Sequence, residues 1–338
     1  MNKTAVVILN YNGAHFLTKF LPTAIERSPE AEIIVADNAS TDDSVEIMQR
    51  DFPNIRLLTY ETNEGYAGGY NRALKEIEAE YYILLNSDIE VTGHWIKPMT
   101  ELMDQEPELV ACQPKILAYY NKSRFEYAGA SGGFIDQYGY PFCRGRIMES
   151  TESDTDQYND SLEIFWATGA CMIVRSNVFH ELGGFDTDFF AHMEEIDFCW
   201  RAKNVGYKIK VQPQSVVYHV GGGTLPKTSP QKTYLNFRNN FMLLYKNLPS
   251  KRLFRVIALR LILDGVAGIK FLLEGHAKDM WAVVRAHFYF YRHLSDLRKK
   301  RAALSQNYIS QIYQGSIVWA HFIKGIKKFS ALKPEKFS

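Results

Sequence analysis

The sequence predicts an α/β fold, in which a mostly parallel central sheet is flanked by helices and followed by a C-terminal helical extension. Three observations predict it: apolar runs alternate with helical patterns over the first hundred residues, the connections are short, and the charge changes sign near residue 240. Strand–helix alternation with short connections is typical of parallel sheets with helices on both faces. Ligands of such sheets bind at the carboxyl ends of the strands, so polar residues there are the functional candidates.

The first third of the chain supplies most of the predicted sheet. Ala5–Leu9 is a continuous apolar run, as expected of a strand that is buried on both faces. Apolar patterning and capping residues predict the other elements in the same way. The expected strands are 5–9, 32–36, 55–59, 81–85 and 109–113, and the expected helices are 14–27, 42–50, 67–79 and 95–105.

The middle of the chain interrupts this alternation. Residues 118–158 are rich in Gly, Tyr and Ser, and we expect irregular structure or small hairpins that border a cleft. After Tyr234 we expect the chain to be helical and basic to its end. These patterns divide the chain into a domain of residues 1–240 and a basic helical region of residues 241–338. The elements expected between them are strands at 171–175 and 208–211 and helices at 177–182 and about 193–204.

Charge is distributed unevenly along the chain. Residues 1–239 carry 21 Lys and Arg against 33 Asp and Glu, whereas residues 240–338 carry 18 against 5. Such a basic appendage is expected to meet an anionic partner. Its amphipathic patterns favour an anionic membrane surface, and no recognition motif for nucleic acid accompanies the charge. A helical cap that packs on the first domain, or on a second copy in a homodimer, is the alternative.

Cysteine usage and hydropathy bear on the compartment. Cys112, Cys143, Cys171 and Cys199 form no CxxC pair, and their spacing suits neither zinc nor a disulfide framework, which predicts a reducing compartment. We recognise no secretory signal and no run of about 20 apolar residues. We therefore expect a cytoplasmic protein that lies peripherally at the inner face of the cell membrane.

Polar motifs follow the second and third predicted strands. Asp37 begins Asp-Asn-Ala-Ser-Thr-Asp, where an acid can bind a base or ribose, although the same residue types favour turns and helix caps. The glycines of Asn63–Asn71 allow a ligand to approach a helix N-terminus, or alternatively allow tight packing on the sheet. The spacing is not GxGxxG, and no Gly-rich turn follows the first strand. A nicotinamide-dependent oxidoreductase is therefore disfavoured.

Two further positions are candidates for metal binding. Asp88 ends the Asn86-Ser87-Asp88 motif after the fourth strand, and a carboxylate there could hold Mg²⁺ or Mn²⁺ against a departing diphosphate. His219 follows a strand-like stretch and precedes a run of glycines, and imidazole is acceptable to Mn²⁺. The alternatives are a polar turn at Asp88 and a structural histidine at 219.

Three carboxylates stand near the start of a predicted helix. Glu194 and Glu195 are crowded by neighbouring acids, which should raise the pKa and suits a general base. Favourable placement of acids at a helix N-terminus would explain the same residues. For Asp197 we favour such a structural role, or an ion pair with Arg201 one turn later.

Taken together, these motifs resemble the family 2 glycosyltransferases, inverting enzymes of the GT-A (Rossmann-like) fold, and are most similar to the bacterial rhamnosyltransferase-like branch. The similarity covers Thr4 to about Asn240. It is carried by VVILNYNG, ADNASTDDS, NEGYAGGYNRAL, YYILLNSDIE, ATGACMIVRS, ELGGFDTDFFAHMEEIDFCWRAKNVGY and VVYHVGGGT. Residues 1–240 would then form the catalytic domain.

The resemblance implies roles for individual residues. Asp88 matches the last acid of the family's DxD motif, and Asn86 stands where the first Asp often is. His219 would complete the metal site. Glu195 would be the base, with Glu194 as the alternative, because the family commonly has Asp at position 195. The nucleotide would be bordered by Asn10, Asp37, Asn63, Gly65, Asn71 and Asn86.

The function implied is a metal-dependent, inverting hexosyltransferase. The donor would be a dTDP- or UDP-linked sugar, with rhamnose a candidate, and the acceptor a hydroxyl of a cell-surface glycan or a lipid-linked glycan. The resemblance also places Trp166–Gly169 near the sugar or acceptor, although a buried aromatic would explain Trp166 equally well. The alternative function is a catalytically silent nucleotide-sugar-binding or scaffold protein of a membrane polysaccharide assembly.

Overall fold

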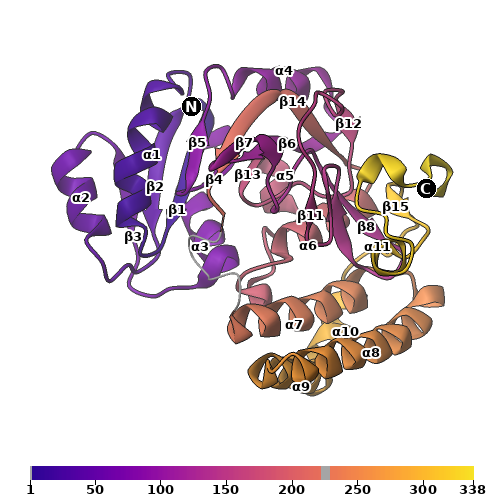
Figure 1. Cartoon of the computed structure of the whole chain (residues 1–338). Helices are drawn as coiled ribbons and strands as arrows, with labels where there is room; N and C mark the ends of the chain where they lie inside the picture. The colour runs from indigo at the N-terminus through magenta and orange to yellow at the C-terminus, as the bar shows by residue number, and fades with distance from the viewer. Residues whose placement is uncertain (1, 222–228) are drawn as a thin grey trace.

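A computed structural model describes residues 2–221 and 229–338 of the chain. Its central sheet has the strand order β12-β14-β6-β13-β4-β1-β2-β3, and β5 and β7 pair with β14 and β6 at one end (Figure 1). The strands β4, β1, β2 and β3 are mutually parallel. The bounds are β1 Asn2–Asn10, β2 Glu32–Asp37, β3 Arg56–Thr59, β4 Ala79–Asn86, β5 Ile89–Val91, β6 Leu109–Ala118, β7 Asn121–Phe125, β12 Leu162–Glu163, β13 Cys171–Arg175 and β14 Lys208–His219.

Both faces of this sheet are buried, which explains the continuous apolar runs of its strands. Val7 and Ile34 point into one core, and Val6 and Val35 point into another on the opposite face. The second core packs against α1, α2 and α4, and the first against α3, α5 and α6. The helix bounds are α1 Ala14–Glu26, α2 Ser44–Asp51, α3 Gly65–Leu74, α4 Lys97–Gln105, α5 Ser176–Glu181 and α6 Glu194–Asn204.

The structure confirms the mixed, mostly parallel sheet and corrects some details. The expected helix 67–79 ends at Leu74, because the chain is already extended as β4 at Ala79. The strand 171–175 forms as expected but runs antiparallel to β4 and β6. The expected strand 208–211 extends to His219 along β6, so that His219 lies at its end.

Residues 118–158 fold into hairpins, one of the two outcomes expected for them. They supply most of a second sheet of order β11-β10-β9-β8-β15, whose last strand comes from the C-terminal tail. Trp166 forms an isolated bridge with Gly133 of this sheet. The bounds are β8 Gly133–Asp136, β9 Pro141–Cys143, β10 Arg146–Ile147, β11 Ser150–Thr151 and β15 Ile312–Tyr313.

The C-terminal region begins with four helices that pack below the sheet (Figure 1). Residue 240, where we divide the chain, lies inside the first of them, and this division stays a proposal. The expectation of helix to the chain end is wrong, because residues 303–338 return to the second sheet through β15 and form only short helical turns. The helices are α7 Pro230–Asn247, α8 Ser250–Leu273, α9 Ala277–Arg292, α10 Leu294–Ala302 and α11 Ile317–Phe322.

Two other expectations concern membranes and thiols. Among the described helices, none combines the length and the apolarity that crossing a bilayer requires. The four cysteines are free thiols, and all are buried.

Candidate active site

Parallel pairing brings the predicted strand-end residues to one edge of the sheet. Asn10 is in register with Asp37, and Leu9 is in register with Asn86. The amide nitrogen of Asn10 donates to the Asp37 carboxylate at 3.0 Å, and both side chains are buried. Oδ1 of Asn10 is buried without a hydrogen-bond partner among the described residues. This uncommitted acceptor suits a donor group of a ligand, such as an N–H of a nucleobase.

The Asn63–Asn71 motif is built around a turn that requires glycine. Gly65 has φ +71°, and a Cβ there would collide with the carbonyl oxygen of Phe190. Asn63 Oδ1 accepts from the backbone N–H of Gly65 at 2.8 Å, and Asn38 donates to the same oxygen at 3.0 Å. The amide of Asn71, on α3, both donates to and accepts from the Phe185 backbone. These two hydrogen bonds commit the Asn71 amide to packing.

Asp88 and His219 meet although they lie 131 positions apart in the chain. Nε2 of His219 lies 3.1 Å from Oδ1 of Asp88, and its Nδ1 lies 3.0 Å from Oε2 of Glu126. Burial acts to lower the pKa of His219, but the two carboxylates outweigh it and raise the pKa to about 10. Burial acts to raise the pKa of Asp88 and Glu126, but His219 outweighs it and lowers both.

The donor atoms of this cluster fit a divalent cation in part. Mn²⁺ accepts a carboxylate oxygen and an imidazole nitrogen, so Asp88 and His219 would serve as ligands once the ring gives up the Nε2 proton that it shares with Asp88, with Glu126 on the other ring nitrogen. In the described part of the chain, no group of three or more His, Cys, Asp and Glu is arranged to hold a metal.

Glu194 and Glu195 begin α6 after a strained turn. His192 and Met193 have φ values of +71° and +74°, a conformation that non-glycine residues seldom adopt and that clusters at functional sites. Each glutamate has one buried carboxyl oxygen without a hydrogen-bond partner among the described residues. Burial, and after it the charge of Glu195, raises the pKa of Glu194 well above its ordinary value. Burial raises the pKa of Glu195 to about 7.

A short segment joins the glutamates to the strand-end cluster. The backbone amide of Gly169 faces the Glu195 carboxylate. Its carbonyl accepts from the Tyr66 hydroxyl at 2.5 Å, and the next carbonyl, that of Ala170, accepts from the N–H of Asn86 at 3.0 Å. A chain of backbone contacts thus runs from Glu195 through Gly169, Ala170 and Asn86 toward Asp88. Trp166 is instead buried, with its indole N–H donated to Phe134, so the buried-aromatic interpretation holds for it.

Asp197 belongs to the scaffold, as its sequence context suggested. Its carboxylate is fully buried and pairs with Arg201 at 2.8 Å and with Lys246 of α7 at 2.9 Å. Burial acts to raise its pKa, but these two cations outweigh burial and lower it strongly. The predicted ion pair with Arg201 is confirmed, and the second cation ties α6 to α7.

Sequence reasoning missed the residues of α7 that hold the strained turn. Asn239 donates to the carbonyls of Phe189, Ala191 and His192, and Arg238 donates to that of Phe189 as well. Both side chains are buried. The run Arg238-Asn239-Asn240 in an otherwise amphipathic helix was the available signal. Glu126 was also missed, because no periodicity marks it. The glycines after Gly221 in the His219 motif lie outside the described residues.

Comparison with known protein families assigns the chain to one of them. The model for Glycosyl transferase family 2 matches residues 5–183, which is more than half of the chain. The chain belongs to this family. It is a glycosyltransferase of GT-A fold, as the resemblance of its motifs implied.

Relatives of this family 2 glycosyltransferase include enzymes of glycan assembly. It is 24% identical over 230 residues to the N-acetylglucosaminyl-diphospho-decaprenol L-rhamnosyltransferase of Mycobacterium tuberculosis, covering 63% of this chain and 75% of the relative. It is 26% identical over 282 residues to the low-salt glycan biosynthesis hexosyltransferase Agl10 of Haloferax volcanii, covering 81% and 86%. Among solved structures, GalNAc-T7 with UDP, GalNAc and Mn²⁺ matches with a TM-score of 0.57 at 15% identity. That match covers 74% of this chain, which spans 49% of the GalNAc-T7 chain.

Proposed function

We propose that this glycosyltransferase inverts the anomeric centre of a nucleotide-linked sugar, with Glu195 as the general base. The observation that carries the proposal is the pair of adjacent glutamates at the start of α6, of which Glu194 is buried and Glu195 is half-buried. Each keeps a carboxyl oxygen without a partner among the described residues, and burial raises the pKa of Glu195 to about 7. An uncompensated buried carboxylate costs stability, so it is retained where chemistry needs it.

The two glutamates are suited to different roles. Glu194 is almost completely buried, and burial raises its pKa well above the ordinary range, which favours its protonated form. Glu195 is half-buried, so an acceptor can reach it, and a pKa near 7 suits proton transfer at neutral pH. Glu195 would take the proton of the acceptor hydroxyl as that oxygen attacks the anomeric carbon. A single displacement from the face opposite the leaving group inverts the centre.

The strand-end residues would hold the donor. Asn10 and Asp37 offer an acceptor atom and a carboxylate to the base and ribose, and the Asn63–Gly65 turn would border the nucleotide. Asp88 and His219 would hold Mg²⁺ or Mn²⁺, which supplies Lewis-acid neutralisation of the diphosphate. Glu126 would orient the His219 ring for that role.

The donor and acceptor classes follow from the relatives. One relative is named an L-rhamnosyltransferase acting on a diphospho-decaprenol-linked glycan, and a structural neighbour was crystallised with UDP. We therefore propose a dTDP- or UDP-linked hexose as donor, with rhamnose the first candidate, and a cell-surface or lipid-linked glycan as acceptor. The basic α8–α9 pair, which exposes large apolar side chains, would bring the enzyme to an anionic membrane surface.

Donor hydrolysis with and without Mn²⁺ tests the proposal, with a panel of UDP-, dTDP- and GDP-sugars as donors. We expect Asp88→Ala to abolish metal-dependent turnover, and Glu195→Gln to bind donor normally while losing transfer by about 100-fold or more. Glu108→Gln is the matched control, because this exposed carboxylate pairs with Lys208 at the opposite end of β6. Full activity of Asp88→Ala would contradict the metal assignment, and a larger loss in Glu194→Gln would make Glu194 the base.

A further inference from the structure

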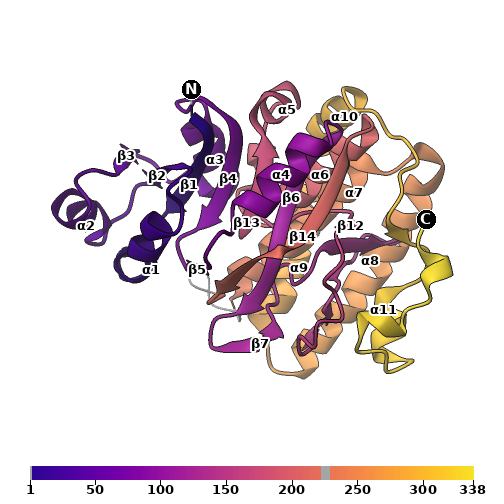
Figure 2. The ribbon, with the colours of Figure 1, turned by 90° about the horizontal axis from the view of Figure 1, so that it is seen from above.

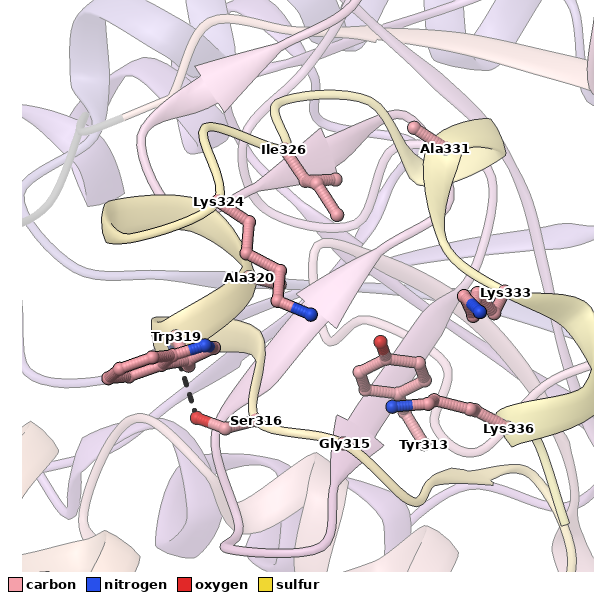
Figure 3. Close-up of a pocket in the computed structure, with 10 residues that line it drawn as sticks. All are labelled: Tyr313, Gly315, Ser316, Trp319, Ala320, Lys324, Ile326, Ala331, Lys333 and Lys336. Carbon is pink, nitrogen blue, oxygen red and sulfur yellow. Dashed lines mark hydrogen bonds between the residues drawn. The ribbon is translucent and has the colours of Figure 1, made fainter.

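A cavity of about 230 Å³ lies in the C-terminal tail, on the side of the molecule opposite β1, β2 and β3 (Figures 1 and 2). Its walls come entirely from residues 313–336, between β15 and the last helical turn. It therefore shares no wall with the candidate active site. Figure 3 shows the side chains around it, which are Tyr313, Gly315, Ser316, Trp319, Ala320, Lys324, Ile326, Ala331, Lys333 and Lys336.

The charged groups in this wall are all cationic. Lys324 and Lys336 have no acidic partner among the described residues, and their side chains extend toward the space beside the Tyr313 ring (Figure 3). Lys333 has only an exposed partner, Glu335, at 3.8 Å, and such pairs contribute little in water. Three lysines thus line a small space whose described wall contains no carboxylate, and their charges repel one another unless an anion joins them.

Neutral donors complete the wall. Tyr313 is buried, but its hydroxyl points into the same space and has no hydrogen-bond partner among the described residues (Figure 3). The hydroxyl oxygen of Ser316 accepts from the backbone N–H of Trp319 at 3.2 Å, which leaves the hydroxyl proton for another acceptor. Gly315 is needed beside the ring, because a Cβ there would collide with Tyr313. Donors and cations therefore form part of the wall, beside the apolar side chains of Ala320, Ile326 and Ala331.

We propose that this cavity binds a phosphate or diphosphate group, as a second site separate from the donor site. Ammonium and hydroxyl groups donate to phosphate oxygens, and lysine is a common phosphate ligand. The exposed apolar side chains of Trp319 and Phe322 on α11, and of Ile323 directly after it, lie beside the cavity. The phosphate therefore has two sources to be distinguished, a soluble phosphate ester or the headgroup of a lipid whose chains rest on α11. The site does not depend on the proposed transfer reaction.

Calorimetric titration of the full chain with inorganic pyrophosphate, in EDTA, tests the site. We expect Lys324→Ala/Lys336→Ala to weaken binding by at least about tenfold. Lys327→Ala/Lys328→Ala removes the same charge from the same segment outside the cavity wall, and should bind as the unmodified protein does. All four lysines are at least partly exposed, so both pairs should fold, and thermal unfolding checks this. Equal affinity of the two double variants would overturn the proposal.

A second arm identifies the source of the phosphate. If the ligand is a lipid headgroup, Lys324→Ala/Lys336→Ala should co-sediment less than Lys327→Ala/Lys328→Ala with phosphatidylcholine vesicles that contain phosphatidylglycerol. If both variants sediment equally while only Lys324→Ala/Lys336→Ala loses pyrophosphate, the ligand is a soluble phosphate ester. Tyr313→Phe should weaken pyrophosphate by a smaller factor. Donor hydrolysis should be unchanged in Lys324→Ala/Lys336→Ala, so failure here is distinguishable from failure of the proposed transfer.

Discussion

At the scale of single residues, the proposed base makes activity depend on pH in a defined direction. Glu195 acts when deprotonated, and its pKa is raised to about 7, so kcat/KM should rise roughly tenfold from pH 6 to pH 8 and then level off. A pH profile of transfer, or of donor hydrolysis, measures this. Glu194→Gln should keep the rise, since this change leaves the Glu195 carboxyl in place. A profile already flat at pH 6 would contradict the assignment.

The neighbouring glutamate makes a prediction about stability. The pKa of Glu194 is raised in the folded state, so between its unfolded and folded values the native state binds more protons and the free energy of unfolding falls as pH rises. Glu194→Gln removes this penalty. We expect the variant to be about 1–3 kcal/mol more stable than the unmodified protein at pH 8, with the difference vanishing toward pH 4. Denaturant unfolding at both pH values measures it, and a destabilised variant at pH 8 would contradict it.

At the scale of elements, α6 and α7 are joined by a buried ion cluster. Asp197 pairs with Arg201 and with Lys246, so Asp197→Ala removes the carboxylate of Arg201 and leaves the buried Lys246 with Asp186. We expect a loss of about 3–5 kcal/mol in the free energy of unfolding, measured by denaturant titration. Asp296→Ala, which removes an exposed pair with Lys299, should cost less than about 1 kcal/mol. A loss of that small size for Asp197→Ala would show that the cluster does not hold the two helices.

The same helix positions the proposed base through the turn that precedes it. Asn239 donates to three carbonyls of the strained segment 189–192, so Asn239→Ala should let the start of α6 relax. We expect kcat to fall about tenfold or more while donor KM changes little, because Asn10 and Asp37, which would bind the base and ribose, lie on β1 and β2. Steady-state kinetics on the folded variant measures this. Asn239→Asp keeps the size but not the donor N–H, and should not restore kcat.

The sequence predicted elements where one local pattern decides the outcome. The apolar runs of β1, β2 and β4 need only burial on both faces, and the positions of Asn10, Asp37 and Asn86 then follow from strand ends. The direction of β13 was not predictable, because antiparallel and parallel buried strands have the same composition. Glu126 and Asn239 were missed because their roles arise from partners 93 and about 50 positions away. Such contacts have no local signature.

At the scale of the whole molecule, the charge asymmetry predicted a basic appendage but not its path. The tail after α10 returns to the second sheet, where Phe329 and Phe337 pack on Phe134 and Phe142. The pattern of residues 303–338 gave no sign of this, since the aromatic residues that receive the tail lie about 190 positions earlier. The basic region therefore includes part of the core around the second sheet as well as the exposed helices α8 and α9.

The exposed faces of α8 and α9 make the last prediction. Phe254, Ile262, Ile269 and Leu273 on α8 and Trp281 on α9 are each more than half exposed, and basic residues flank them. We expect anionic vesicles to sediment the protein, less so at high salt, and Ile262→Glu/Ile269→Glu to weaken this at least about tenfold. Tyr120 lies outside these helices and is more exposed than Ile262 or Ile269, and Tyr120→Glu should have no effect. If the double variant instead dissociates a dimer and leaves vesicle binding intact, this face is a subunit contact, because glutamate disrupts an apolar interface as it disrupts insertion between lipids.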